Sequence, residues 1–305
     1  MNTARYLRLT KITAIGVAAL LILYTGISVY GAIATMGAPR LPLTETPSSV
    51  GLAYEDVSFT SRDDNIVLRG WFIAGQRDSV IIFVHGGYNN RIDDNVDTLS
   101  LARDLVNKGY NLLLFDLRGR GESEGEGSTF SNNERDIGGA VDYLESRGFP
   151  LKDVYIIGFC SGAAMVCIFA SQNNVGALVM DGCFAHAHDV FVRRIALEGI
   201  PEFIVRFFRP GISLMISIIY DYEPVNPTDV VADVTCPILF IHEENDGFIT
   251  REEMHNLFRV SGNPANEFWE VRDAAHSQGY RTSPAAYIEK VDLFLITRAK
   301  DKTSQ

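Results

Sequence analysis

Short apolar runs alternate with amphipathic segments along most of the chain. Apolar residues at helical spacing predict helices near 96–108, 131–147, 161–172, 250–260 and 284–298. Short runs rich in β-branched, aliphatic and aromatic residues predict strands near 54–60, 66–74, 80–84, 111–115, 153–158, 176–181, 237–242 and 267–271. Because strands that alternate with helices form parallel sheets covered on both faces, the pattern predicts an α/β fold with a mostly parallel, eight-stranded sheet.

The N-terminal pattern differs, because residues 12–36 form one apolar segment without a charged side chain. As a helix that rises about 1.5 Å per residue, this segment is long enough to cross the roughly 30 Å hydrocarbon core of a bilayer. We therefore expect residues 1–36 to form a short tip and a transmembrane anchor. The alternative is a cleaved signal peptide, because Ala32-Ile33-Ala34 has the small-x-small form, although the apolar region of such peptides is typically only about 7–15 residues long.

The charges around this segment predict its orientation. Arg5, Arg8 and Lys11 precede the segment, whereas Arg40 alone follows it closely. Since positive charges favour the cytoplasmic side, we expect a cytoplasmic N-terminus and an extracytoplasmic domain. Residues 37–53 contain three prolines and predict a short extended linker to a domain at 54–305.

The stretch at about 184–230 fits no strand–helix repeat. Its apolar residues predict amphipathic helices that pack over the strand ends, as a lid inserted into the domain. The alternative is a second membrane span at 200–220, but Arg206, Arg209 and Pro210 interrupt that segment. A central arginine costs about 2.5–3.5 kcal/mol on insertion scales. A lid beside a membrane anchor would also be placed to contact lipid.

Composition and charge limit the classes of partner. The net charge is −11, and no basic run outside the extreme N-terminus could neutralise phosphates, so the sequence argues against a nucleic-acid partner. His186 and His188 lie two residues apart, but no neighbouring cysteine or third histidine completes a metal-ligand set. We therefore expect no metal and no cofactor.

The four cysteines, at positions 160, 167, 183 and 236, have irregular spacing and predict no disulfide framework. Cys167 and Cys236 lie in apolar contexts typical of core residues. Cys160 follows the predicted strand at 153–158, and Cys183 follows the next predicted strand, at 176–181. The two thiols are therefore a candidate redox pair in an oxidising compartment.

Cys160 lies in the segment Gly158-Phe159-Cys160-Ser161-Gly162, between a strand and a helix start rich in small residues. This Gly-x-Cys-x-Gly turn has the layout of a nucleophile elbow, in which a sharp turn exposes the central side chain above the sheet. The glycines let the backbone and helix approach that side chain closely. An ordinary turn with a buried cysteine is one alternative, and Ser161 as the nucleophile is another, although the glycines would then lie at the wrong offsets.

Other strand ends carry the remaining groups that such a nucleophile needs. The strand at 80–84 ends in His85-Gly86-Gly87-Tyr88, a turn that can offer backbone N–H groups to an oxyanion. Asp246 follows a later strand and His276 follows the last one, which gives the chain order nucleophile, acid, histidine. Asp181, at the end of the strand at 176–181, is the second candidate for the acid, and Asp273 is the third.

From about Tyr54 to Ile296 the sequence resembles the α/β-hydrolase superfamily. The resemblance rests on His85-Gly86-Gly87, Asp116-x-Arg118-Gly119-x-Gly121-x-Ser123, the elbow at 158–162 and the loops of Asp246 and His276. It is most similar to the membrane-anchored bacterial branch grouped with serine aminopeptidases and prolyl-oligopeptidase-type hydrolases, in which the elbow usually carries serine. The cysteine here is similar to that of dienelactone hydrolases. The Asp116 to Ser123 segment predicts a structural turn.

The resemblance implies an enzyme with a triad of Cys160, His276 and Asp246. A helix N-terminus and an imidazolium both favour the thiolate form of a cysteine. The backbone N–H groups of Gly87 and Ser161 would bind the oxyanion, while His85 would shape the oxyanion loop without titrating.

We expect the substrate to be a small acyl compound with an ester, thioester or lactone bond, and peptide bonds are less favoured. Tyr88, Phe159 and Phe184 are predicted to contact it. A hydrolase-fold binding protein without activity is the alternative. Because Asp246 and His276 are both present, the enzyme is favoured, and the oligomeric state stays open.

Overall fold

The computed structural model describes residues 3–126, 132–187, 190, 193, 199–220, 222 and 225–301. The chain divides into two compact units. The larger unit comprises residues 38–190 and 224–305, and the smaller comprises residues 1–37 and 191–223. The part of the predicted lid at 188–198 lies mostly outside the described residues, as does His188.

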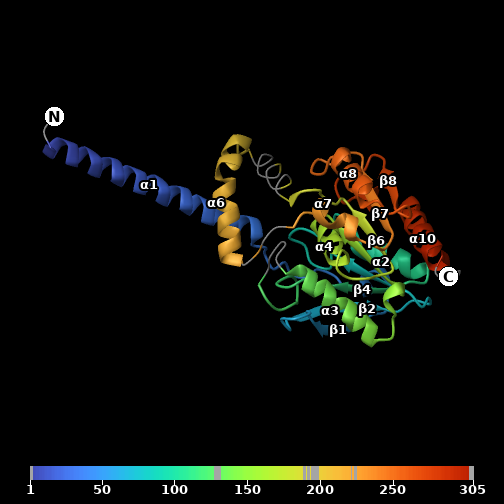
Figure 1. Ribbon diagram of the computed structural model, residues 1–305. Coiled ribbons are helices and arrows are strands. Elements are labelled where there is room, and N and C mark those ends of the chain that lie inside the picture. Colours follow the sequence, from blue (N-terminus) through green and yellow to red (C-terminus); the bar gives the residue numbers. More distant parts are fainter. Residues whose placement is uncertain are drawn as a thin grey trace. The chain divides into compact units, whose positions relative to one another are not determined.

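The larger unit is built on one eight-stranded sheet with the order β1-β2-β4-β3-β5-β6-β7-β8 (Figure 1). Its strands are β1 (Glu55–Thr60), β2 (Val67–Ile73), β3 (Val80–Val84), β4 (Asn111–Phe115), β5 (Val154–Phe159), β6 (Ala177–Asp181), β7 (Ile238–Glu243) and β8 (Glu267–Val271). Strand β2 is antiparallel to both of its neighbours, and all other pairs are parallel. The eight strands and the mostly parallel sheet that the sequence predicts are therefore confirmed.

Helices cover both faces of this sheet. They are α2 (Thr98–Asn107), α3 (Asn133–Ser146), α4 (Ser161–Ala170), α7 (Pro227–Val230), α8 (Arg251–Ser261), α9 (Gly279–Thr282) and α10 (Pro284–Asp301), and short 3-10 turns lie at 47–50, 151–153 and 231–233. Apolar side chains of α3, α4 and α8 form one core with one face of the sheet. Those of α2, α9 and α10 form a second core with the other face.

The central strands are fully buried because their side chains enter both cores. Every residue of β3, β4, β5 and β6 is buried, which is why these strands appear in the sequence as continuous apolar runs. The parallel strands β3, β5, β6 and β7 end at the same edge of the sheet, so the loops that follow them gather there. The predicted site residues lie in these loops and in the loop after β8, except Phe159, which ends β5, and Ser161, which begins α4.

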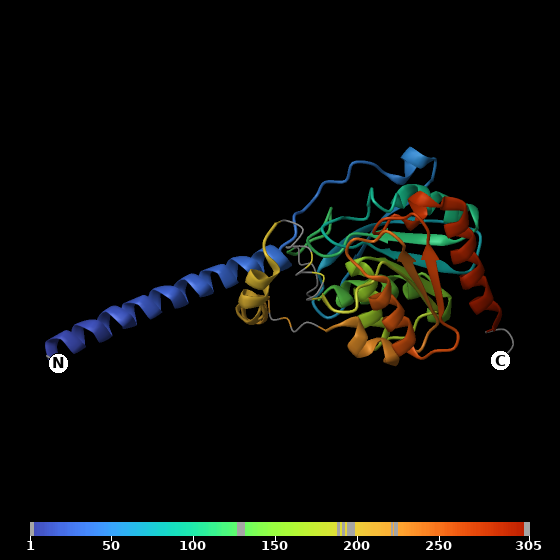
Figure 2. The same cartoon turned by 90° about the horizontal axis from the view of Figure 1, so that it is seen from above.

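The smaller unit contains two helices, α1 (Thr3–Met36) and α6 (Glu202–Tyr220), which pack against each other. Helix α6 crosses α1 at a steep angle, as the two views of Figures 1 and 2 show together. Both helices are long and apolar enough to cross a membrane, judged by length and composition. Helix α1 is the predicted anchor segment, and α6 falls within the predicted lid region.

Candidate active site

Cys160 stands at a sharp turn between β5 and α4. Its backbone has φ 54° and ψ −118°, a conformation that side-chain-bearing residues rarely adopt and that costs on the order of 1–3 kcal/mol. A Cβ added at Gly158 would lie 2.7 Å from the Cα of Ala163, and one added at Gly162 would lie 2.7 Å from the carbonyl oxygen of His85. Only glycine fits at these two positions, because Gly158 lies against the start of α4 and Gly162 lies against the loop after β3.

His276 lies between the predicted acid and the predicted nucleophile. Its Nδ1 is 2.6 Å from Oδ2 of Asp246, and its imidazole also interacts with the side chain of Cys160. The other carboxylate oxygen of Asp246 accepts hydrogen bonds from the backbone N–H groups of Phe248 (2.7 Å) and Ile249 (2.8 Å). These bonds fix the orientation of a fully buried carboxylate, which in turn orients the imidazole.

The electrostatic surroundings favour a charged imidazole. Burial disfavours the imidazolium, but the interactions with Cys160 and with the Asp246 carboxylate outweigh this and raise the pKa of His276 to about 11. A protonated His276 beside the Asp246 carboxylate can stabilise negative charge that develops on a neighbouring group.

The loop after β3 lies directly against the elbow. A Cβ added at Gly86 would come within 2.8 Å of the Cβ of Cys160. The N–H of Gly87 donates a 2.7 Å hydrogen bond to Oγ of Ser161, so the two predicted oxyanion-hole residues touch each other in the free protein. The N–H of Ser161 is at the first position of α4, where a helix has no carbonyl four residues earlier to accept it.

His85 is a buried, neutral side chain. Its Nε2 accepts a hydrogen bond from the N–H of Leu117 (3.1 Å), and burial together with nearby Arg120 lowers its pKa to about 3. Asp116 accepts hydrogen bonds from the N–H groups of Arg91 (2.8 Å) and Glu122 (2.9 Å). These two residues therefore hold loops in place, in line with the structural roles expected for them.

The two rival acids are placed elsewhere. The hydroxyl of Tyr287 donates a 2.6 Å hydrogen bond to the buried carboxylate of Asp181. Asp273 has a left-handed backbone with φ 58°, and its N–H donates to the carboxylate of Glu244 (3.0 Å). Neither side chain is hydrogen-bonded to His276 among the contacts of the described residues.

Sequence reasoning missed the role of Glu243, the last residue of β7. Burial raises the pKa of its carboxyl well above the usual range, and the neighbouring Asp181 raises it further. The pKa of Asp181 is also raised, chiefly by burial. Burial therefore favours the protonated form of both carboxyls, and neither oxygen of Glu243 has a hydrogen-bond partner among the described residues. Atoms of Glu243, Asp246 and His276 that could bind a metal ion lie within 4.8 Å of one another. However, Nδ1 of His276 is already 2.6 Å from the Asp246 carboxylate.

This carboxyl pair predicts a pH-dependent stability. Because the folded state holds a proton that the unfolded state releases above its ordinary carboxyl pKa, stability falls as pH rises from about 4.5. We expect Glu243→Gln to raise the free energy of unfolding by about 1–2 kcal/mol near pH 9 and to have little effect near pH 5. Thermal unfolding at both pH values measures this, with the exposed neighbour Glu244→Gln as the matched control. Equal shifts in the two variants would contradict a raised pKa of Glu243 in the folded protein.

The residues predicted to contact substrate differ in exposure. Phe159 and Phe184 are each 2% exposed and belong to the two cores, whereas Tyr88 is partly exposed. Their contact with substrate stays a prediction.

All four cysteines are free, so no disulfide joins Cys183 to Cys160, and Cys183 is buried. His186 is exposed and lies 3.2 Å from the hydroxyl of Thr228.

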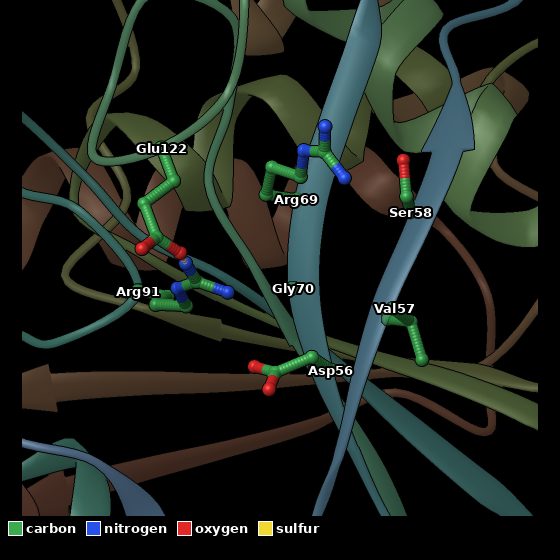
Figure 3. A pocket seen from close by; sticks show the side chains of 7 residues that line it. All are labelled: Asp56, Val57, Ser58, Arg69, Gly70, Arg91 and Glu122. Atoms are coloured by element: carbon green, nitrogen blue, oxygen red, sulfur yellow. Dashed lines mark hydrogen bonds and ion pairs between the residues drawn. The ribbon is translucent and has the colours of Figure 1, made fainter.

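A shallow cavity of about 400 Å³ lies elsewhere, over β1 and β2. Figure 3 shows the side chains of Arg91 and Glu122 pointing toward each other at its edge, where they form an ion pair. Strand β2 is three places from β5 in the sheet order, so this cavity is separate from Cys160. Asp56, also in its lining, accepts a hydrogen bond from the indole N–H of Trp71 (3.1 Å), and none of the triad residues lines the cavity.

Comparison with known proteins agrees with this architecture. A family model described as alpha/beta hydrolase fold matches residues 79–197. The esterase Pf2001 of Pyrococcus furiosus has a similar structure, with a TM-score of 0.73 and 24% identity over 86% of this chain and 98% of the esterase. The uncharacterized protein YfhR of Salmonella typhi is 24% identical over 246 residues, which cover 74% of this chain and 75% of YfhR.

A further relative is the lysophosphatidylserine lipase ABHD12 of Macaca fascicularis. It is 23% identical over 206 residues, and the match covers 62% of this chain but only 47% of the lipase. The family-model match begins just before β3 and includes the elbow, and the structural similarity extends over most of the chain. The chain therefore has the α/β-hydrolase fold.

Proposed function

We propose that this protein is a membrane-anchored hydrolase that cleaves ester, thioester or lactone bonds through Cys160, His276 and Asp246. The observation that carries the proposal is the single imidazole that contacts both Cys160 and Asp246. This is the geometry of an activated nucleophile with an oriented base. The esterase Pf2001, which shares the fold, makes an ester bond the first substrate class to test.

The reaction proceeds in two halves. The sulfur of Cys160 attacks the carbonyl carbon of the ester, and the carbonyl oxygen becomes an oxyanion. When this adduct collapses, the carbon–oxygen bond to the alcohol breaks, and the imidazolium of His276 gives its proton to the departing alkoxide. The remaining thioester is then attacked by water, whose proton His276 takes, and the acid leaves as Cys160 is released.

Oxyanion binding requires a local exchange of hydrogen bonds. In the free protein the Gly87 N–H is occupied by Oγ of Ser161. The oxyanion takes the place of that hydroxyl at Gly87 and also accepts from the Ser161 N–H. Each such donor contributes roughly 3–4 kcal/mol of transition-state stabilisation.

Helix α1 supplies the proposed anchor. The side chains of its 18-residue apolar window are almost entirely exposed, with 6% of that window buried, as expected for a helix surrounded by lipid. Arg5, Arg8 and Lys11 before the apolar segment favour a cytoplasmic N-terminus. We therefore propose a single-pass protein whose larger unit lies on the extracytoplasmic side. Its proposed substrate is a small acyl compound.

Leaving-group chemistry predicts which bond is cleaved faster. In a tetrahedral adduct on sulfur, the thiolate departs more readily than an unprotonated amine, whereas a phenolate competes well. We expect kcat/KM for a short acyl p-nitrophenyl ester to exceed that for an aminoacyl anilide by at least about tenfold, a barrier difference of about 1.4 kcal/mol. Hydrolysis of both compounds by the detergent-solubilised full chain measures this. Faster turnover of the anilide would instead support an aminopeptidase.

A further inference from the structure

Helix α6 carries a stripe of exposed apolar side chains. Phe203, Phe207, Leu214 and Ile218 are 72%, 65%, 57% and 65% exposed, respectively. At about 100° per residue, their spacing of 4, 7 and 4 residues places all four within roughly 60° of one another around the helix. Exposed apolar patches of this kind mark an interaction surface, because water solvates them poorly.

The stripe adjoins the surface through which α6 packs on α1. The ring of Tyr24 on α1 stacks on Phe208 with ring centroids 5.0 Å apart and meets Phe207 edge-on at 5.6 Å. Small residues bring the backbones close, because a Cβ at Gly211 would collide with Ser28 and one at Gly31 would lie 2.7 Å from Ile212.

These contacts fix the direction in which the stripe faces. Phe207, within the stripe, contacts Tyr24, whereas Ile212, roughly opposite the stripe around α6, contacts Gly31 further along α1. The stripe therefore faces the N-terminal part of α1. That part of α1 is itself exposed and apolar, with Leu20 and Ile22 68% and 74% exposed.

The position of the crossing along α1 matches the outer boundary of a bilayer. Tyr24 and Gly31 follow Lys11 by 13 and 20 residues, which at about 1.5 Å per residue correspond to about 20 and 30 Å. With Lys11 at one edge of a hydrocarbon core roughly 30 Å thick, α6 lies near the opposite edge. Since α6 crosses α1 steeply, it runs along the membrane plane when α1 spans it (Figure 2).

The polar residues of α6 occupy the other side of the helix. Arg206 forms an ion pair with Glu202, and both are exposed and lie well outside the stripe. Ser213 is also exposed on that side. An amphipathic helix with this division binds with its apolar face about 5–10 Å into the boundary between headgroups and acyl chains.

A tyrosine of α1 supports the backbone of α6 where Pro210 interrupts it. Proline has no N–H to continue the helical hydrogen-bond ladder. The hydroxyl of Tyr24 accepts from the N–H of Gly211 (3.2 Å) and donates to the carbonyl of Phe207 (3.3 Å). Polar backbone groups satisfied in this way can be placed in lipid at low cost.

We propose that α6 is an interfacial membrane helix that lies in the outer leaflet beside α1, with Phe203, Phe207, Leu214 and Ile218 among the acyl chains. The partner is the lipid bilayer itself. The proposal rests on the proposed membrane anchor but not on the catalytic assignment. Under this proposal α6 is not a second membrane span. It is also not a lid helix whose only role is to cover the catalytic site.

Depth-dependent quenching of tryptophan fluorescence tests this placement. The full chain is reconstituted into phosphatidylcholine vesicles whose acyl chains carry bromine either near the headgroup or near the bilayer centre. The variants are Leu214→Trp on the stripe, Ser213→Trp on the polar side as the matched control, and Leu21→Trp on α1 as the depth standard. The wild-type signal of Trp71 and Trp269 is subtracted.

We expect the fluorescence of Leu214→Trp to be quenched about twofold more by the shallow bromine than by the deep one. The fluorescence of Leu21→Trp should be quenched more by the deep bromine. The fluorescence of Ser213→Trp should be quenched only weakly by either. If Leu21→Trp responds and Leu214→Trp is quenched no more than Ser213→Trp, the α6 proposal fails while the anchor stands. Strong deep quenching at both 213 and 214 would indicate a second span and also overturn it. Absence of quenching at Leu21→Trp would overturn the anchor, and the α6 proposal with it.

Discussion

Replacement of Cys160 by alanine is expected to lower kcat/KM for a short acyl p-nitrophenyl ester by a factor on the order of 10³ or more. The variant keeps the fold and the oxyanion donors but lacks the atom that attacks the carbonyl carbon. Its turn is still strained, because alanine also carries a Cβ at the positive φ of this position. Initial rates of ester hydrolysis measure the loss, and circular dichroism checks that the fold is retained.

The variant Cys160→Ser separates two explanations of the cysteine. His276 and Asp246 have the arrangement that activates a hydroxyl in serine hydrolases, so we expect Cys160→Ser to retain measurable ester hydrolysis well above that of Cys160→Ala. The shorter carbon–oxygen bond withdraws the nucleophile by a few tenths of an Å, and rates fall steeply with such misplacement. Complete loss of activity in the serine variant would mean that the site is tuned for sulfur.

One outcome would refute the catalytic assignment altogether. If wild type, Cys160→Ser and Cys160→Ala all gave the same background rate on short and long acyl esters, Cys160 would not be a nucleophile. The protein would then be better described as an anchored binding protein with a hydrolase fold.

Asp246→Asn is the second substitution with a large expected effect. The asparagine oxygen can still accept the N–H groups of Phe248 and Ile249, so the loop stays folded. Its amide nitrogen, however, would face Nδ1 of His276 as a donor and select the wrong tautomer. We expect kcat to fall by on the order of 10³–10⁴, as when the acid of a comparable triad becomes an amide.

The rival acids provide matched controls for this substitution. Asp273→Asn changes an exposed carboxylate in the loop of His276, and Asp181→Asn changes a buried carboxylate whose hydrogen bond comes from Tyr287. We expect each to lower kcat by less than about tenfold, with the larger loss of thermal stability in Asp181→Asn. A greater loss of kcat in either control than in Asp246→Asn would reassign the acid.

Local sequence determined the secondary structure and the elbow. The central strands are buried on both faces and therefore appear as unbroken apolar runs, which require no knowledge of their partners. The strained turn at Cys160 follows from Gly158 and Gly162, because no other residue fits against Ala163 and His85. The strands and the Gly158 contact depend on neighbours in sequence, whereas the contact of Gly162 with His85 comes from a loop far away in the chain.

The tertiary structure, by contrast, decided which carboxylate reaches His276. Asp181, Asp246 and Asp273 all follow strands near the same sheet edge, and their sequence contexts did not exclude any of them. Packing selected Asp246 by bringing its carboxylate to 2.6 Å from His276. The same packing buried Glu243 beside Asp181 and occupied the Gly87 N–H with Ser161, contacts between residues that are far apart in the chain.

For the segment at 202–220, too, the sequence predicted a helix, and the tertiary structure decided how that helix packs. Its composition alone was compatible with a lid, a second span or a surface helix, because amphipathic spacing does not say which surface the apolar face meets. Within the smaller unit, Gly211 and Ile212 pack on α1 and leave the Phe203 to Ile218 stripe exposed. The sequence by itself determined the elements and the Gly-x-Cys-x-Gly turn, whereas the pairing of Asp246 with His276 and the packing of α6 on α1 were decided by contacts that only the folded chain creates.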